Sequence, residues 1–71
     1  MDRTPVSSSS IAAIGYSRDE RQLEVEFKHG AVYQYRGVPP EVFEAFLAAD
    51  SKGTFFNQGV KDHYLYTRSD R

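Results

Sequence analysis

The stretch from residue 23 to residue 35 constrains the fold more than any other part of this chain, because it has the pattern of one β-hairpin. Apolar Leu23, Val25 and Phe27 alternate with charged residues, as in a strand that is buried on one face only. After a turn, tyrosines at positions 33 and 35 alternate in the same way. The geometry of that turn decides to which face both tyrosines point.

Two turns are compatible with the residues between these strands. A two-residue turn would place both tyrosines on the polar face of the hairpin. A three-residue loop closed by Gly30 in the left-handed conformation would place Tyr33 opposite Val25 and Tyr35 opposite Leu23. We favour this second form, because it gives one continuous apolar face, and we predict that both tyrosines are core residues first.

An earlier strand is predicted over residues 11–17, joined to the hairpin by a charged turn at residues 18–21. The register that brings apolar residues together places Tyr16, Ile14 and Ala12 opposite Leu23, Val25 and Phe27. In that register the opposite, open face of the sheet carries three apolar residues, Ile11, Ala13 and Val32, where a free face is normally polar.

Two helices are predicted after the strands. Pro40 suits the first turn of a helix, which we expect to run to about Asp50, and Gly53 suits its end. Thr54 can cap a second, shorter helix, and Tyr64 to Tyr66 either extend it or form a short edge strand. The expected fold class is therefore α+β, a three-stranded antiparallel meander followed by two helices packed on one face (β-β-β-α-α).

The chain length of 71 residues predicts one small domain. We expect a disordered tail over residues 1–8, a single domain over residues 9–66 and a flexible charged tail over residues 67–71. The second helix is expected to bury Phe56, Val60 and Tyr64 on one face.

Composition argues against several classes of protein. The absence of cysteine excludes disulfides and thiolate metal sites, and no apolar run is long enough to span a membrane. Without an export signal, a cytoplasmic monomer that does not associate with membranes is expected. Residues 9–66 hold six Lys/Arg against eight Asp/Glu, a net charge of −2, so a broad basic surface for nucleic acid is not expected.

The chain carries no pattern typical of an enzyme. Neither histidine, His29 nor His63, has a partner at catalytic spacing, and no nucleophile elbow, metal motif or glycine-rich phosphate loop is present. We therefore expect no catalysis, no cofactor and no metal.

One polar cluster suggests an anion site at the start of the second helix. Free backbone N–H groups, a hydroxyl and ammonium groups could hold a phosphate there, using Ser51, Lys52, Gly53, Asn57 and Lys61, with Arg36 as an extension. The alternative is an ordinary capped helix start, in which Asn57 ties down the loop and Lys61 lies in solvent. Tyr35 and Phe55 could stack on bases, and the alternative for both is a role in the core.

Three segments together resemble one known family, the KTSC domain. The matching pieces are Ser-Ser-x-Ile-x-x-Ile-Gly-Tyr at residues 8–16, Leu-x-Val-x-Phe-x-x-Gly-x-x-Tyr-x-Tyr-x-x-Val-Pro at residues 23–39, and Phe-Leu-x-Ala-x-Ser-x-Gly-x-x-Phe-Asn-x-x-Val-Lys-x-x-Tyr at residues 46–64. The family is named for the C-terminus of certain lysyl-tRNA synthetases and also occurs as small stand-alone bacterial proteins. The resemblance implies no activity, and RNA binding has been suggested for the family.

Two functions are therefore carried forward from the sequence. The first is a small RNA-binding module that uses the start of the second helix for phosphate and Tyr35 or Phe55 for stacking. The second is a protein-interaction module or homo-oligomer that uses the open sheet face.

Overall fold

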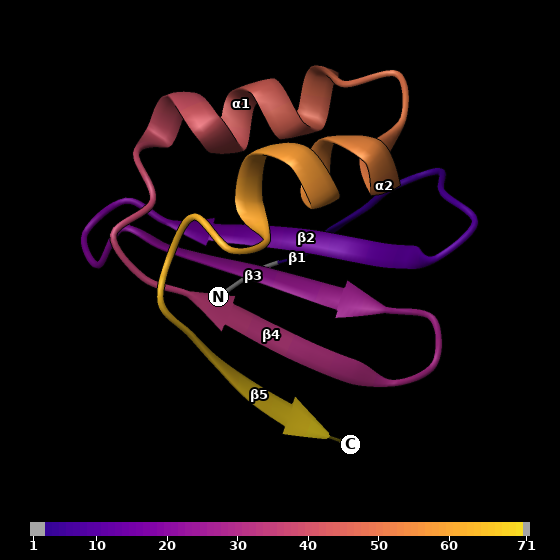
Figure 1. Ribbon diagram of the computed structural model, residues 1–71, viewed down its shortest axis with the longest axis horizontal. Coiled ribbons are helices and arrows are strands. Elements are labelled where there is room, and N and C mark those ends of the chain that lie inside the picture. The colour runs from indigo at the N-terminus through magenta and orange to yellow at the C-terminus, as the bar shows by residue number, and fades with distance from the viewer. Residues whose placement is uncertain (1–2, 71) are drawn as a thin grey trace.

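The computed structural model describes residues 3–70, which form one antiparallel sheet covered on one face by two helical segments (Figure 1). The strands lie in the sheet in the order in which they follow one another along the chain. The elements are β1 (Arg3–Pro5), β2 (Ile11–Ser17), β3 (Gln22–Phe27), β4 (Ala31–Tyr35), α1 (Pro40–Ala48), α2 (Lys52–Phe55), the π-helical turn η1 (Phe56–Val60) and β5 (Tyr66–Asp70).

The α+β class is confirmed, but the sheet has five strands and not three. β1 and β5 pair with β2 and β4 and form the edges of the sheet. β1 lies in the predicted N-terminal tail, whereas β5 begins at Tyr66, where an edge strand was one of the two alternatives, and continues through the predicted C-terminal tail. Edge strands are held by backbone hydrogen bonds and are often polar, so they carry no apolar alternation that a sequence pattern could reveal. Residues 6–8 of the predicted N-terminal tail connect β1 to β2, and the Val6 N–H donates to the Ala12 carbonyl at 3.1 Å. Residues 1–2 and 71 of the predicted tails lie outside the described residues.

The three-residue hairpin loop is confirmed. Tyr33 pairs with Val25 and Tyr35 with Leu23, and Gly30 has a φ of 106°, a region that favours glycine. Both tyrosines consequently face the helices. The Tyr35 side chain is only 1% exposed.

The β2–β3 register is confirmed at Tyr16 and Ile14, but it is wrong at the third step. A β-bulge between Ile11 and Ala13 brings Ile11, and not Ala12, opposite Phe27. The extra residue turns Ile11 into the core, where it is 0% exposed. Ala13 and Val32 are also buried, so the apolar patch expected on the open face is absent from the described surface.

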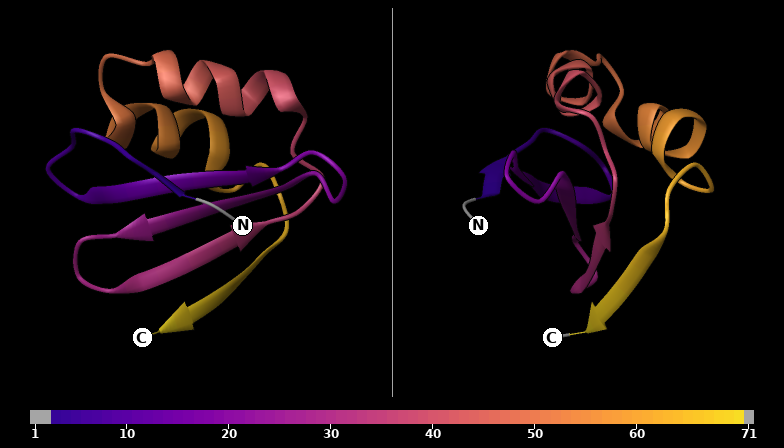
Figure 2. Two further views of the ribbon diagram at one scale, coloured as in Figure 1. Left: turned by 180° about the vertical axis from the view of Figure 1, so that it is seen from behind. Right: turned by 90° about the vertical axis from the view of Figure 1, so that its left-hand side faces the viewer.

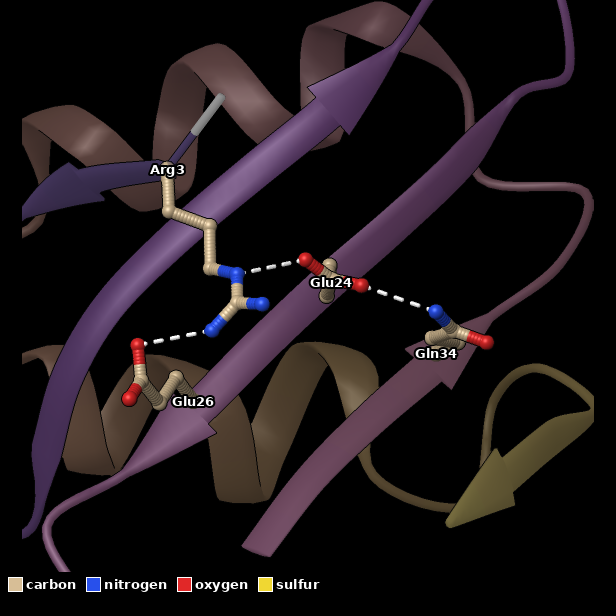
Figure 3. A network of polar contacts seen from close by, with 4 residues as sticks. All are labelled: Arg3, Glu24, Glu26 and Gln34. Atoms are coloured by element: carbon tan, nitrogen blue, oxygen red, sulfur yellow. Dashed lines mark hydrogen bonds and ion pairs between the residues drawn. The ribbon is translucent and has the colours of Figure 1, made fainter. Parts of the chain in front are cut away.

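The open face instead carries a polar network that ties β1 to the centre of the sheet (Figure 3). Arg3 Nε donates to Glu24 Oε1 at 2.6 Å, and Arg3 Nη1 donates to Glu26 Oε1 at 2.8 Å. Gln34 Nε2 donates to the second Glu24 oxygen at 2.8 Å, which completes the shell of a carboxylate that is mostly buried. Arg3 reaches β3 across Gly15 of β2, which has no side chain in the way.

The α1 helix packs on the sheet through aromatic rings. Phe46 is 0% exposed and stacks on Phe55 with ring centroids 5.1 Å apart. Phe43 stacks on Tyr16 at 5.2 Å, and the Tyr16 hydroxyl donates to the Val38 carbonyl. The helix begins at Pro40 as expected and ends at Ala48, slightly before the expected Asp50, because the backbone of the next residue is extended.

The second helical segment differs from the prediction at both ends. Its N-cap is Ser51 and not Thr54, because the Ser51 Oγ accepts a hydrogen bond from the Thr54 N–H at 3.3 Å. At the other end the Lys61 N–H donates to the Phe56 carbonyl at 2.8 Å, which closes a wider, π-helical turn. Figure 2 shows α1 and this segment on the same side of the sheet, with β5 extending beyond them. Neither helix within residues 3–70 has the length and apolar character needed to cross a membrane.

Candidate binding groove

A groove of about 330 Å³ lies on the helix-covered side of the sheet, between the second helical segment and strands β4 and β5. Its floor consists of aromatic rings and its rim consists of polar side chains. We call these sets the aromatic floor (Phe27, Tyr33, Tyr35, Phe56 and Tyr66) and the polar rim (Ser10, His29, Asn57, Lys61 and Asp62).

The aromatic floor is a continuous stack across three strands. The Tyr66 ring lies 5.4 Å from the ring centroids of both Tyr33 and Tyr35. Tyr33 in turn meets Phe27 edge to face at 5.4 Å, and Tyr35 meets Phe56 edge to face at 5.8 Å. Such pairs contribute about 0.5–1.5 kcal/mol each beyond the area that they bury, so the floor is a rigid surface.

Sheet register explains why these rings gather. Tyr33 and Tyr35 share one face of β4 because they are two residues apart, and the pairing of β5 places Tyr66 directly beside Tyr35. The same register places Arg68 beside Tyr33. The Arg68 guanidinium carbon lies 5.5 Å from the Tyr33 ring centroid, and its Nη1 donates to the Tyr33 hydroxyl at 3.3 Å. A cation therefore lies at the edge of the floor.

The Tyr35 hydroxyl opens into the groove. No group of residues 3–70 forms a hydrogen bond with it, and the same residues contain no buried side-chain oxygen or nitrogen without a partner, so the hydroxyl must reach the groove surface. Burial raises the pKa of Tyr35 from 10.0 to about 12, and the negative charges of ionised Tyr33 and Tyr66 and of Asp62 act in the same direction. The environment of Tyr35 thus favours its neutral phenol.

This shift predicts a loss of stability in strong alkali. The unfolded chain releases the Tyr35 proton near pH 10 and the folded chain only near pH 12, so the folded state binds the proton more tightly. The free energy of unfolding is expected to lose up to about 1.4 kcal/mol per pH unit between these values through this group, and nothing below them. Urea unfolding across the interval, compared with Tyr35→Phe, measures the effect. Equal losses in both proteins would refute the assignment.

Two unusual backbone features shape the polar rim. The π-helical turn at Phe56–Val60 widens the helix next to the floor, and Asp62 directly after it has a φ of 75°. Asn57, Lys61 and Asp62 all line the groove as a result. Within the described part of the chain, these three side chains form no hydrogen bond or ion pair with the protein. They are therefore available to a ligand.

The structure divides the predicted anion cluster. Gly53, Asn57 and Lys61 line the groove together with Tyr35. Ser51 and Lys52 lie outside the lining, where they cap helices.

In detail, the Ser51 Oγ donates to the Thr54 hydroxyl at 2.9 Å, and the Lys52 ammonium donates to the Ala49 carbonyl at the end of α1. The Ser51 contact matches the capping alternative, whereas Asn57, which that alternative expects to tie down the loop, forms no side-chain hydrogen bond within residues 3–70. Arg36 is exposed after β4, where its N–H donates to the Leu65 carbonyl at 2.9 Å, and it does not line the groove. Phe55 stacks on Phe46 beneath α1 and is also outside the lining.

Sequence reasoning missed several groove residues. Tyr66 and Asp62 had no assigned role, and His29 was treated as a turn residue, although its ring stacks on Phe27 at 5.5 Å at the rim. Only the alternation of Tyr33 and Tyr35 indicates the floor, and it predicts core residues first, with stacking on bases as a further role for Tyr35. The contribution of Tyr66 depends on where β5 lies in the sheet, which no local sequence pattern specifies.

The groove has no evident metal-binding chemistry. Residues 3–70 contain no group of three or more His, Cys, Asp or Glu side chains placed to hold a metal ion. The arrangement instead combines flat aromatic faces with the ammonium group of Lys61 and the carboxylate of Asp62, which suits an organic ligand with a planar ring and a negative charge.

Comparisons with known proteins agree with the fold. The family model described as KTSC domain matches residues 7–64. An uncharacterized protein of Stutzerimonas stutzeri (strain A1501) is 51% identical over 99% of this chain and 100% of its own length. A lysine–tRNA ligase of Nostoc punctiforme is 38% identical over 82% of this chain, which corresponds to only 10% of the ligase. The crystal structure of a KTSC domain protein from Yersinia pestis superposes with a TM-score of 0.93 at 44% identity, covering 96% of both chains.

Proposed function

Because the chain belongs to the KTSC domain family, we propose that it is a non-catalytic module that binds unpaired RNA in the groove between η1 and β5. The observation that carries this proposal is the stack of Tyr33, Tyr35 and Tyr66 with Lys61 beside it. The proposal keeps the RNA ligand expected from the sequence. It moves the site from the start of the second helical segment to the groove at its end.

Stacking supplies the first part of the argument. Single-stranded RNA is recognised largely through unstacked bases that lie on aromatic side chains. Tyr66 is 56% exposed although its ring stacks on Tyr33 and is tilted against Tyr35, so it is held in place by its neighbours and still accessible to a base. One base on such a ring contributes about 1–3 kcal/mol to binding.

Charge and size supply the second part. The chain as a whole has a formal net charge of −1, which does not favour a long nucleic-acid footprint. Lys61 nevertheless lines the groove beside the floor and provides a cation for one phosphate. A groove of about 330 Å³ is at the small end of the range for ligand sites and suits one nucleotide. The similarity to part of a lysine–tRNA ligase, a protein named for a tRNA, agrees with this class of ligand.

The test is an amide chemical-shift titration with a short single-stranded RNA of mixed sequence at low salt. We expect shifts at groove residues 57–68 and a dissociation constant that rises with salt. Lys61→Ala should weaken binding several-fold and reduce the salt slope by about one, because one phosphate contact is lost.

Lys52→Ala is the matched control, since that ammonium bonds to the Ala49 carbonyl outside the groove. It should leave both affinity and salt slope unchanged. Absence of shifts at high RNA concentration would exclude the proposed function.

The hypothesis of an interaction through the open sheet face was based on three apolar residues expected to be exposed there, Ile11, Ala13 and Val32. All three are buried, so this observation no longer supports the hypothesis. The polar groups of that face instead satisfy one another in the Arg3 network. We therefore propose a monomer, which gel filtration of the same sample tests.

A further inference from the structure

Asp62 is held in the groove by a costly backbone conformation. Its φ of 75° lies in the left-handed region, which only one other non-glycine residue of the described chain adopts. A non-glycine residue loses on the order of 1 kcal/mol there, although Asp tolerates it better than most residues. The neighbouring Lys61 ends the π-helical turn with extended backbone, so the chain reverses at this point and places Asp62 on the polar rim.

Asp62 is an exposed residue that lines the groove, and its carboxylate adds a negative charge to the polar rim, which disfavours a ligand that brings phosphate alone. It lies close enough to the floor to oppose ionisation of Tyr35, and no positively charged or hydrogen-bonding group of residues 3–70 neutralises it. A carboxylate can only accept hydrogen bonds. In a groove that also contains Lys61, it calls for a ligand that brings N–H donors as well as an anion.

Among the four RNA bases, only one presents two adjacent donors on its Watson–Crick edge. Guanine offers N1–H and the N2 amino group, which match the two oxygens of a carboxylate. Uracil offers one N–H between two carbonyl oxygens, and adenine and cytosine each place a bare ring nitrogen beside their amino group. For these three bases a lone pair would face a carboxylate oxygen, which is repulsive.

We propose that Asp62 makes the groove selective for guanine, with N1–H and N2–H of the base donating to its two carboxylate oxygens. This inference rests on the proposed function, and it names the base that the groove takes. The face of the guanine ring lies on Tyr66, and Lys61 contacts the 5′ phosphate. The same chemistry is present in an unpaired guanine of RNA and in a free guanine nucleotide.

The experiment measures binding of two sets of probes by fluorescence anisotropy or calorimetry. One set is short single-stranded RNAs that differ only in one central base, and the other is the four nucleoside 5′-monophosphates. We expect the guanine probe to bind roughly tenfold more tightly than the other three, since one bidentate contact has an effect of that order.

Asp62→Asn removes one acceptor and the charge, and asparagine tolerates the left-handed backbone. It should abolish the guanine preference without weakening the binding of the other bases. Asp50→Asn is the control, because that exposed carboxylate lies outside the groove and its loss should leave the preference intact.

The outcomes separate this inference from the proposed function. RNA binding with no base preference, or a preference that survives Asp62→Asn, would overturn the role of Asp62 and leave the RNA-binding proposal standing. Binding of guanosine monophosphate without binding of RNA would support the guanine site and overturn the RNA proposal. No binding of either set would overturn both.

Discussion

Replacing Phe46 by alanine is expected to leave most of the chain unfolded at room temperature. The ring is 0% exposed and stacks on Phe55, so its removal leaves a cavity where α1 meets the second helical segment. Deleting a buried phenylalanine ring typically costs about 3–5 kcal/mol. A domain of this size rarely has more than about 3–5 kcal/mol of stability in total, and this chain has no cysteine to add a disulfide.

Far-ultraviolet circular dichroism and urea titration measure the effect. Leu47→Ala is the matched control, because the next side chain along the same helix is 37% exposed and its truncation should cost far less. A Phe46→Ala protein that unfolds cooperatively at nearly the wild-type urea concentration would show that the two helical segments do not depend on this contact.

Replacing Tyr66 by alanine is expected to weaken RNA binding about tenfold or more while leaving most of the stability intact. The ring is 56% exposed and lies at the outer side of the stack with Tyr33 and Tyr35. Loss of one stacking surface typically costs about 1–3 kcal/mol of binding free energy. Because the core beneath it stays closed, the free energy of unfolding should change much less than the free energy of binding.

Anisotropy titrations of wild type, Tyr66→Ala and Tyr66→Phe make this measurement. The phenylalanine variant keeps the flat ring and should bind nearly as well as the wild type. If alanine binds as tightly as phenylalanine at position 66, the aromatic floor is not where the base lies.

The central hairpin and α1 could be predicted from the sequence, because both are specified locally. Gly30 is suited to only one of the two possible turns, and that turn fixes Tyr33 and Tyr35 on the helix side. Pro40 likewise marks the first turn of α1.

Other features could not be predicted, because the residues that form them are compatible with more than one structure. Ile11 could face either side until the bulge in β2 sets its direction. Phe56 and Val60 are four residues apart and are both buried, as a regular α-helix would also require, so their spacing gives no sign of a π-helical turn. The polar strand β5 pairs with β4 through its backbone, which leaves no trace in hydrophobic periodicity.

The candidate site was therefore predicted in part. The sequence placed Gly53, Asn57 and Lys61 near one another, because helical spacing predicts this. It did not bring them to Tyr35 and Tyr66, since that depends on contacts between elements distant in the chain.

The position of β5 at the edge of the sheet has a consequence for affinity. This strand supplies Tyr66 to the aromatic floor, yet it is hydrogen-bonded to a neighbouring strand on one side only. Such a strand detaches at a lower free-energy cost than the centre of the sheet. The protein can then exist in two populations with the same folded core, one with β5 attached that can bind a ligand and one with β5 detached that cannot. The apparent dissociation constant of the ligand is the intrinsic constant divided by the fraction of molecules that can bind. Amide hydrogen exchange in this strand measures that fraction directly.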